Sequence, residues 1–259
     1  MFRALPPFGS DPRGVAEVVN GIMNGKTNNT GSVTLATGNA STTTITDARI
    51  GIDSVILLVP SSAASFASTM PYGAFQSLVD QTIASTTTAY AITLDTTDYS
   101  DGVYLSNSSR MNVRNAGIYN LQWSGQFVNT DTQIHDSSVW LRKNGTDIVG
   151  STGFISVPNK HGGVDGNLIV GWNYYLELAA NDYIEIYWSA TSTQISLQFY
   201  PVGTSPTRPS TASVIATMQY VNPNAASNIY VSSQTNGSAT LTHFSNNTAN
   251  KTYKYIIVG

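Results

Sequence analysis

The stretch Tyr119-Asn120-Leu121-Gln122-Trp123-Ser124-Gly125-Gln126-Phe127 decides the fold class of this chain. Its large apolar side chains alternate strictly with amides and hydroxyls. Successive side chains of a β-strand point to opposite faces of a sheet, so this period of two predicts a strand with one buried and one exposed face. A helix would instead require apolar residues at intervals of three and four.

Similar strand patterns continue on the C-terminal side of this stretch. Asn144-Gly145 is the dipeptide typical of a two-residue type I′ hairpin. Residues 174–178 and 183–188 alternate in the same way around a turn at Asn181-Asp182, and two more alternating strands follow at 195–199 and 214–220. Turns at this spacing are typical of a β-sandwich, so we predict a sandwich domain over residues 90–222 in a mainly β chain.

One short helix is expected near the N-terminus. It follows an extended, proline-containing segment, and Ser10 or Asp11 can cap it while Pro12 fits its first turn. Gly25 can end it. Its apolar residues follow the i, i+3, i+4, i+7, i+8 spacing of a helix stripe: Val15, Val18, Val19, Ile22 and Met23. This stripe needs a partner, either within its own domain or on another protein. We assign residues 1–26 to an attachment arm that includes this helix.

The remaining segments predict two small β modules that flank the sandwich. Residues 27–60 form the first, and its apolar run 54–59 is expected to be a strand buried on both faces. Residues 61–89 are rich in Ala, Ser and Thr and are interpreted as a linker. Residues 223–259 form the second module, in which 237–241 echoes 31–35 as a weak internal repeat.

The composition limits the function classes. Charged residues make up only 10% of the 259 residues, against about a quarter in typical domains. Uncharged polar surfaces suit large subunit contacts and sugar binding alike, because burying them costs less than burying ions. The net charge of −3 and the lack of a Lys/Arg run predict no nucleic-acid partner. The absence of cysteine excludes disulfides, and no apolar run approaches the length of a membrane span, so no membrane insertion is expected.

The middle of the chain resembles the C1q/TNF-like jelly roll. The resemblance rests on the strand entry Gly117-Ile118-Tyr119, the hairpin 141–145, and Leu176-Glu177-Leu178 followed by residues 181–186. Members of that family are compact trimers packed around a threefold axis, which implies a homotrimer here. The resemblance implies a set of jelly-roll core or trimer-interface residues: Tyr119, Leu121, Trp123, Phe127, Leu176, Tyr183 and Tyr187.

The ends of the chain resemble bacteriophage proteins. Residues 8–13 followed by 18–31 are similar to the N-terminal segment of fibre-type proteins of short-tailed phages, and residues 239–243 with 253–259 are similar to a module of phage structural proteins. The resemblance implies a virion protein made in the bacterial host cytoplasm, a tail or head-tail fibre subunit that other tail, neck or capsid proteins hold. Its attachment residues would be Phe8, Val15, Val18, Val19, Ile22 and Met23. A host-surface glycan or receptor-binding module and a capsid decoration (cement) protein are the alternatives.

No constellation of residues predicts catalysis, a metal or a cofactor. The three histidines lack metal-ligand spacing, and adjacent His135 and Asp136 would point to opposite faces of a strand. Asp95, Asp98 and Asp101 fit a polysaccharide depolymerase pair or a Ca²⁺ site less well than an acidic turn between strands.

Surface aromatic side chains are the better lead. Trp140, Trp172 and Tyr175 are candidate glycan contacts, because aromatic faces stack on sugars. The same side chains also anchor subunit interfaces, and in a trimeric jelly roll we favour the interface.

Overall fold

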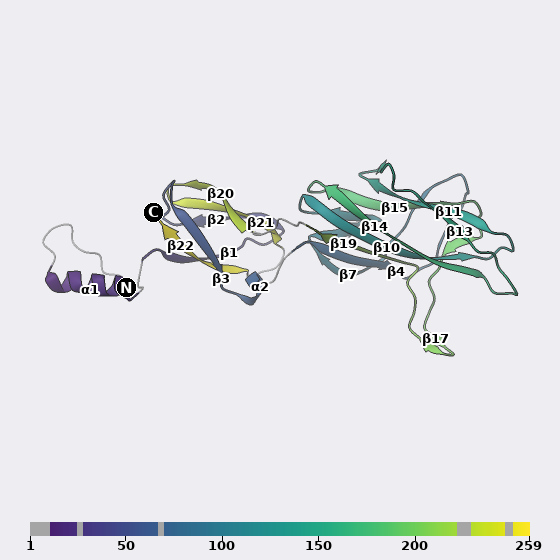
Figure 1. Cartoon of the computed structure of the whole chain (residues 1–259), viewed down its shortest axis with the longest axis horizontal. Helices are drawn as coiled ribbons and strands as arrows, with labels where there is room; N and C mark the ends of the chain where they lie inside the picture. Colours follow the sequence, from purple (N-terminus) through teal and green to yellow (C-terminus); the bar gives the residue numbers. More distant parts are fainter. Residues whose placement is uncertain (1–10, 25–27, 67–69, 222–228, 247–250) are drawn as a thin grey trace. The chain divides into compact units, whose positions relative to one another are not determined.

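The computed structural model describes residues 11–24, 28–66, 70–221, 229–246 and 251–259, and it is mainly β, as the sequence predicts (Figure 1). The chain divides into two compact units. Unit 1 combines residues 1–68 with residues 227–259, and unit 2 contains residues 69–226. The two ends of the chain therefore belong to the same unit.

Unit 1 contains two three-stranded antiparallel sheets. The β22 sheet consists, in spatial order, of β1 (Thr30–Thr34), β22 (Thr252–Val258) and β3 (Val55–Pro60). The β21 sheet consists of β2 (Ala40–Thr46), β21 (Ser238–Asn246) and β20 (Ile229–Thr235). The prediction of two separate β modules at the two ends is therefore wrong, because the central strand of each sheet comes from the C-terminal segment and is flanked by at least one N-terminal strand.

A shared core explains why the two segments combine. One buried cluster draws on both segments: Leu35, Ile45, Ile50, Ala239, Leu241, Tyr255 and Ile257. Each segment contributes three strands, but β1, β2 and β3 do not pair with one another, so each N-terminal strand joins a sheet only by pairing with a C-terminal strand. The alternation of side chains predicts which face of each strand is buried, but it does not say which strands pair.

Strand β3 corrects a second expectation. Its side chains alternate, and Ile56 and Leu58 pack against the core of unit 1. Val55, Leu57 and Val59 lie on the other face and are 55%, 51% and 52% exposed. The apolar run was expected to be buried on both faces, but within unit 1 only one face is covered.

Unit 2 is a sandwich of two seven-stranded sheets. The β10 sheet consists of β5 (Gln81–Thr82), β16 (Ile195–Leu197), β10 (Gly117–Asn129), β19 (Val214–Tyr220), β4 (Tyr72–Ser77), β7 (Thr96–Asp101) and β14 (Gly166–Leu178). Strand β14 pairs with the whole of one edge of β10, and β19 and β16 share the other edge.

The β15 sheet is the second layer. It consists of β12 (Thr146–Asp147), β11 (His135–Lys143), β15 (Tyr183–Ala190), β9 (Arg110–Val113), β8 (Val103–Ser106), β13 (Gly153–Val157) and β6 (Tyr90–Ala91). The segment 61–89 was interpreted as a linker, but it contains α2 (Ala63–Phe66), β4 and β5. Strand β4 pairs with β19 and β7, so it is an integral strand of the β10 sheet.

Inward-facing side chains of the two sheets form the core of unit 2. Phe127 on β10 meets Trp188 on β15 edge-to-face, with ring centroids 6.0 Å apart. Five of the seven residues expected in the core or interface are buried: Tyr119, Leu121, Trp123, Phe127 and Leu176. Tyr183 and Tyr187 are half-buried on the other face of β15, so they do not belong to this core.

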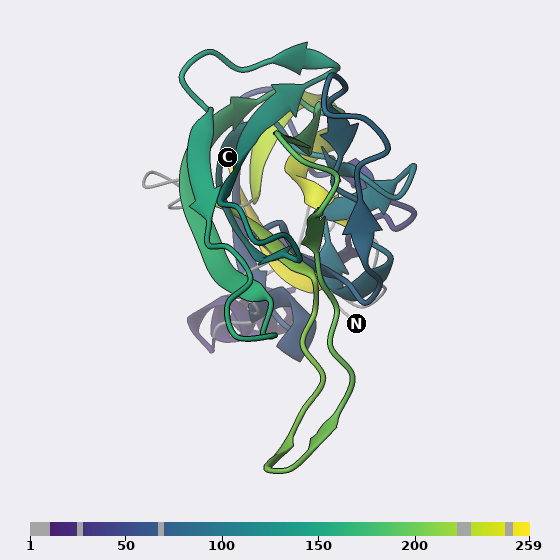
Figure 2. The same ribbon diagram turned by 90° about the vertical axis from the view of Figure 1, so that its right-hand side faces the viewer.

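Two further elements are not strands of these four sheets. Helix α1 (Pro12–Met23) is capped by Asp11, whose carboxylate accepts a hydrogen bond from the Arg13 amide, and this confirms the helix prediction. The hairpin of β17 (Gly203–Thr204) and β18 (Thr207–Arg208) projects away from the sandwich in both views (Figure 2).

Two isoleucines that differ in burial allow a test of the core of unit 2. Ile186 on β15 is 1% exposed, whereas Ile134 is 63% exposed. We expect Ile186→Ala to lower the free energy of unfolding by about 2–5 kcal/mol, because it leaves a cavity in the core. Ile134→Ala should change it by less than about 0.5 kcal/mol. Chemical denaturation of both variants measures this, and equal effects would contradict the assigned burial.

Candidate functional site

The outward face of the β10 sheet carries a group of uncharged polar side chains, which we call the amide face. Its residues alternate with the core residues along β10, β14 and β19: Asn120, Gln122, Asn173, Thr217 and Gln219. Asn120 is paired in register with Tyr175 and Gln219, and Gln122 with Asn173 and Thr217. The strand ladder therefore places the five side chains in two adjacent rows.

Large apolar or aromatic side chains surround the amide face. Tyr175 on β14 and Tyr99 on β7 are 65% and 67% exposed. Ile215 on β19 and Tyr72 on β4 are 45% and 43% exposed, on the same outward face. Glu177 on β14, in register with Ile118, is a charged residue of the same outward face, two residues from Tyr175. Tyrosine rings next to amides are typical of surfaces that bind another protein or a sugar.

A shallow depression lies within the amide face. It has a volume of about 320 Å³, and Tyr72, Ala74, Asn120, Gln122 and Gln219 are among its lining residues. The Asn120 side-chain oxygen is buried and has no hydrogen-bond partner among the described residues. A buried acceptor without a donor costs about 1–3 kcal/mol. The amide face thus contains one acceptor that no donor among the described residues satisfies.

The edge of the sandwich next to β13 and β14 is also apolar. Val149 and Trp172 are 100% and 43% exposed there. Trp172 lies across β13, because a Cβ atom built on Gly153 would come within 2.0 Å of the Trp172 ring. The Tyr174 hydroxyl donates to the Ser151 carbonyl over 3.0 Å. Trp172 therefore helps to close the gap between the two sheets, and the close approach requires glycine at position 153.

The outward face of the β15 sheet carries a row of three aromatic residues. Trp140 and Tyr187 are opposite one another in register, with ring centroids 6.1 Å apart. Phe154 on β13 is 84% exposed and pairs with Ser138, two residues from Trp140. The Trp140 indole donates to Asp147 over 2.7 Å. We call Trp140, Phe154 and Tyr187 the aromatic row.

The three predicted glycan contacts therefore do not form one site. Trp140 lies on the outward face of the β15 sheet, Tyr175 lies beside the amide face, and Trp172 closes the sandwich edge. Phe154 was missed because a single exposed phenylalanine in a Ser/Gly-rich segment looks like an ordinary core position.

The titratable groups singled out in the sequence have structural partners. The Asp95 carboxylate accepts a hydrogen bond from the main-chain amide of Leu78 over 3.0 Å. The Asp98 carboxylate accepts one from the side-chain amide of Gln76 over 2.8 Å. Asp98 and Asp101 lie within strand β7, so the expected acidic turn is partly a strand. Across the part of the chain that the structure describes, no three His, Asp or Glu side chains lie close enough to hold a metal ion.

His135 pairs with an acidic residue other than its neighbour. Its Nε2 atom lies 2.7 Å from the Asp131 carboxylate, and the pKa of Asp131 is lowered chiefly by this hydrogen bond. Asp136 points elsewhere and accepts a hydrogen bond from Ser156. His135 and Asp136 therefore bind different partners, as expected for adjacent side chains that point to opposite faces of β11.

The attachment residues of the helix are accessible. Val15, Val19, Ile22 and Met23 are 37%, 46%, 57% and 79% exposed, and Val18 is half-buried. Phe8 lies outside the described residues. Among those residues, no helix is both long and apolar enough to cross a membrane.

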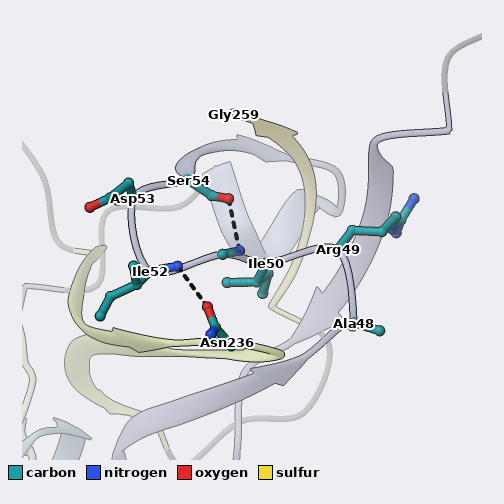
Figure 3. Close-up of a pocket in the computed structure, with 9 residues that line it drawn as sticks. Ala48, Arg49, Ile50, Ile52, Asp53, Ser54, Asn236 and Gly259 are labelled. Carbon is teal, nitrogen blue, oxygen red and sulfur yellow. Dashed lines mark hydrogen bonds between the residues drawn. The ribbon is translucent and has the colours of Figure 1, made fainter.

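A pocket of about 500 Å³ lies in unit 1, on the loop between β2 and β3 (Figure 3). Its shape depends on two main-chain contacts, from the Gly51 amide to Ser54 and from the Ile52 amide to Asn236. The side chains of Arg49 and Asp53 point in opposite directions. The pocket therefore lacks a convergent set of polar side chains, and we do not assign a ligand to it.

An ion pair beside this loop connects the N-terminal and C-terminal segments of unit 1. Asp47 accepts hydrogen bonds from the Arg49 guanidinium and, over 2.8 Å, from the Tyr255 hydroxyl. Arg49 also donates to the main-chain oxygens of Asn28 and Thr30. The hydrogen bonds that Asp47 accepts, chiefly the one from the Arg49 side chain, lower the pKa of Asp47 far below its ordinary value of 3.8.

The lowered pKa predicts how unit 1 responds to acid. A carboxylate whose pKa is lower in the folded state stabilises that state above its unfolded pKa, and this contribution is lost as the pH falls below it. We expect Asp47→Asn to lower the stability at neutral pH and to reduce the further loss between neutral pH and pH ~2. Unfolding curves at several pH values measure both effects, and an unchanged pH dependence in Asp47→Asn would contradict the assignment.

The comparisons with known proteins leave the function to be argued from these surfaces. No protein-family model matches this chain, and no curated protein matches it significantly.

Proposed function

We propose that this chain is a homotrimeric structural subunit of a bacteriophage particle, held at its N-terminal segment and assembled through the amide face of unit 2. The amide face is the observation that carries the proposal. It is a broad sheet face with exposed tyrosines and isoleucine, no charged side chain among its five residues, and one buried acceptor without a partner among the described residues. A second copy can cover such a face without the cost of burying ions.

The strand order supports a jelly roll in unit 2. The chain passes repeatedly between the two sheets, from β10 to β11, from β13 to β14, and from β14 to β15. Strand β4, at the start of unit 2, pairs with β19, at its end. Crossing connections and adjacent first and last strands are typical of double-sheet jelly rolls, the architecture that the C1q/TNF resemblance implies.

The apolar sandwich edge supports a ring rather than a twofold dimer. The edge that contains Val149 and Trp172 differs from the amide face, and both surfaces are exposed. When the edge of one copy packs on the amide face of the next, the contact is heterologous, and a suitable rotation closes it into a ring. Three copies are the number that the family resemblance implies.

The exposed stripe of α1 supports attachment through the N-terminal segment. An amphipathic helix of 12 residues is marginal in water by itself and is stabilised when its apolar face is covered. Another virion protein in the tail, neck or capsid would provide that cover. Placement of the subunit in a particle image, with α1 against a neighbouring protein, would test this part of the proposal.

A charge at the centre of the amide face tests the assembly. We expect the parent chain to have a mass near three times 27.7 kDa in solution. Thr217→Lys should dissociate it into single chains, because an unpaired ammonium would be buried between copies. Ser189→Lys is the matched control, since Ser189 is also a half-buried outward hydroxyl on an inner strand, but of the β15 sheet. Light scattering after size-exclusion chromatography measures the masses. A single-chain parent, or equal behaviour of the two variants, would contradict the proposal.

The aromatic row favours a second candidate function, binding of a host-surface glycan. Aromatic faces beside carboxylates and hydroxyls suit sugar rings. We expect Phe154→Ala to weaken retention on polysaccharide purified from a bacterial host by about three- to tenfold. Val202→Ala, at a 62% exposed position of the projecting hairpin, should leave it unchanged. If the parent chain is not retained, or if both variants bind as the parent does, this second function is rejected.

A further inference from the structure

An exposed group of aliphatic side chains covers the outward face of β3 and β22 in unit 1. We call it the aliphatic patch, and its members lie on two adjacent strands: Val55, Leu57, Val59, Ile256 and Val258. Leu57 is opposite Ile256 in register, and Val55 is opposite Val258. Each of the four valine and leucine side chains is more than half exposed, and Ile256 is half-buried. Isolated exposed aliphatic residues are common, but a contiguous patch on one sheet face marks an interaction surface.

The patch extends to a free strand edge. Among the described residues, β3 pairs with β22 and with no other strand. The Ser61 amide donates to the Thr252 carbonyl, which sets the phase of the antiparallel ladder. By the alternation of such a ladder, the main-chain groups of Ile56 and Leu58 point away from β22. Exposed edges of stable proteins are usually protected by charged side chains or by proline. Here the only such feature within β3 is Pro60, at its end.

The chemistry of the patch indicates its partner. Lys254, opposite Val59, is the one charged residue on this face of β3 and β22. The patch thus offers no pattern of charges by which a different protein would be selected. Two copies of it, however, match each other, because its five members are all aliphatic. Lys254 lies beside Val59 at one end of the patch, where its exposed, long side chain keeps the ammonium in water.

Assembly through unit 2 would supply the second copy. If unit 2 is trimeric, as proposed above, each patch is tethered near two others at an effective concentration of about millimolar. At that concentration a modest patch is sufficient for contact, although it would be too weak to associate free units in dilute solution.

We infer that the aliphatic patch is an interface between copies of this chain, in which β3 and β22 of one copy pack against the same patch of another. This inference rests on the proposed trimer for the supply of neighbouring patches. It adds a second assembly contact, in the unit that contains both ends of the chain. It also explains why the 54–59 segment has the composition of a strand buried on both faces.

The absence of cysteine in the chain allows a direct test. Leu57→Cys, Val55→Cys and Val59→Cys each place one thiol in the patch of the full-length protein. Thr44→Cys is the control, since Thr44 is an exposed residue on the outward face of the β21 sheet in the same unit. The mass of each reduced variant is measured by light scattering, and each is then oxidised at ~10 µM and analysed on a non-reducing gel. A disulfide requires Cβ atoms about 3.5–4.5 Å apart.

We expect at least one patch variant to form disulfide-linked pairs at least about tenfold faster than Thr44→Cys, because the trimer tethers both thiols alike but only the patch thiols are held in contact. A trimer whose patch thiols react no faster than the control overturns the inference and leaves the trimer in place. A single-chain protein whose patch thiols nevertheless pair selectively supports the patch contact and contradicts the trimer. A single-chain protein without selective pairing overturns both.

Discussion

The hydrogen-bonded ladder on both edges of β10 is the constraint on which unit 2 depends. Strand β14 occupies one edge along 13 residues, and β19 and β16 occupy the other. A shift of one residue in this register would exchange the faces of every side chain on the strand. The ladder that buries Tyr119 and Phe127 therefore also places Asn120 and Gln122 on the outward face. The strand register therefore cannot change for the core without also changing for the candidate site, since they are the two faces of the same strands.

Local alternation explains how much of the structure could be predicted. It correctly places Leu121 inside and Gln122 outside, and the capping pattern correctly predicts α1. Alternation carries no information on which strands pair, so the union of both chain ends in unit 1 and the place of β4 in the β10 sheet could not be predicted. The three glycan candidates show the same limit. Each is at least partly exposed, but residues on different sheets do not converge merely because their types agree.

Low charge has one physical consequence for all the candidate contact surfaces. The amide face, the sandwich edge and the aliphatic patch consist almost wholly of uncharged residues, so contacts through them depend on shape and on the release of water rather than on ion pairs. Such contacts change little with salt, whereas contacts through exposed charges are screened within about 10 Å at moderate ionic strength. A particle subunit of the kind proposed above would benefit from this independence in media of varying salt content.

The union of the two chain ends also constrains the order of assembly. The β22 sheet has its central strand at residues 252–258, and β1 and β3 have no ladder partner among the described residues until that strand is in place. Domains generally fold as units during and after synthesis, so unit 2 can fold while unit 1 is still incomplete. The Asp47 carboxylate likewise gains its Tyr255 hydrogen bond only from the completed chain. Contacts that require unit 1, including the aliphatic patch, are therefore confined to full-length chains, and a truncated chain that still associates through unit 2 would lack them.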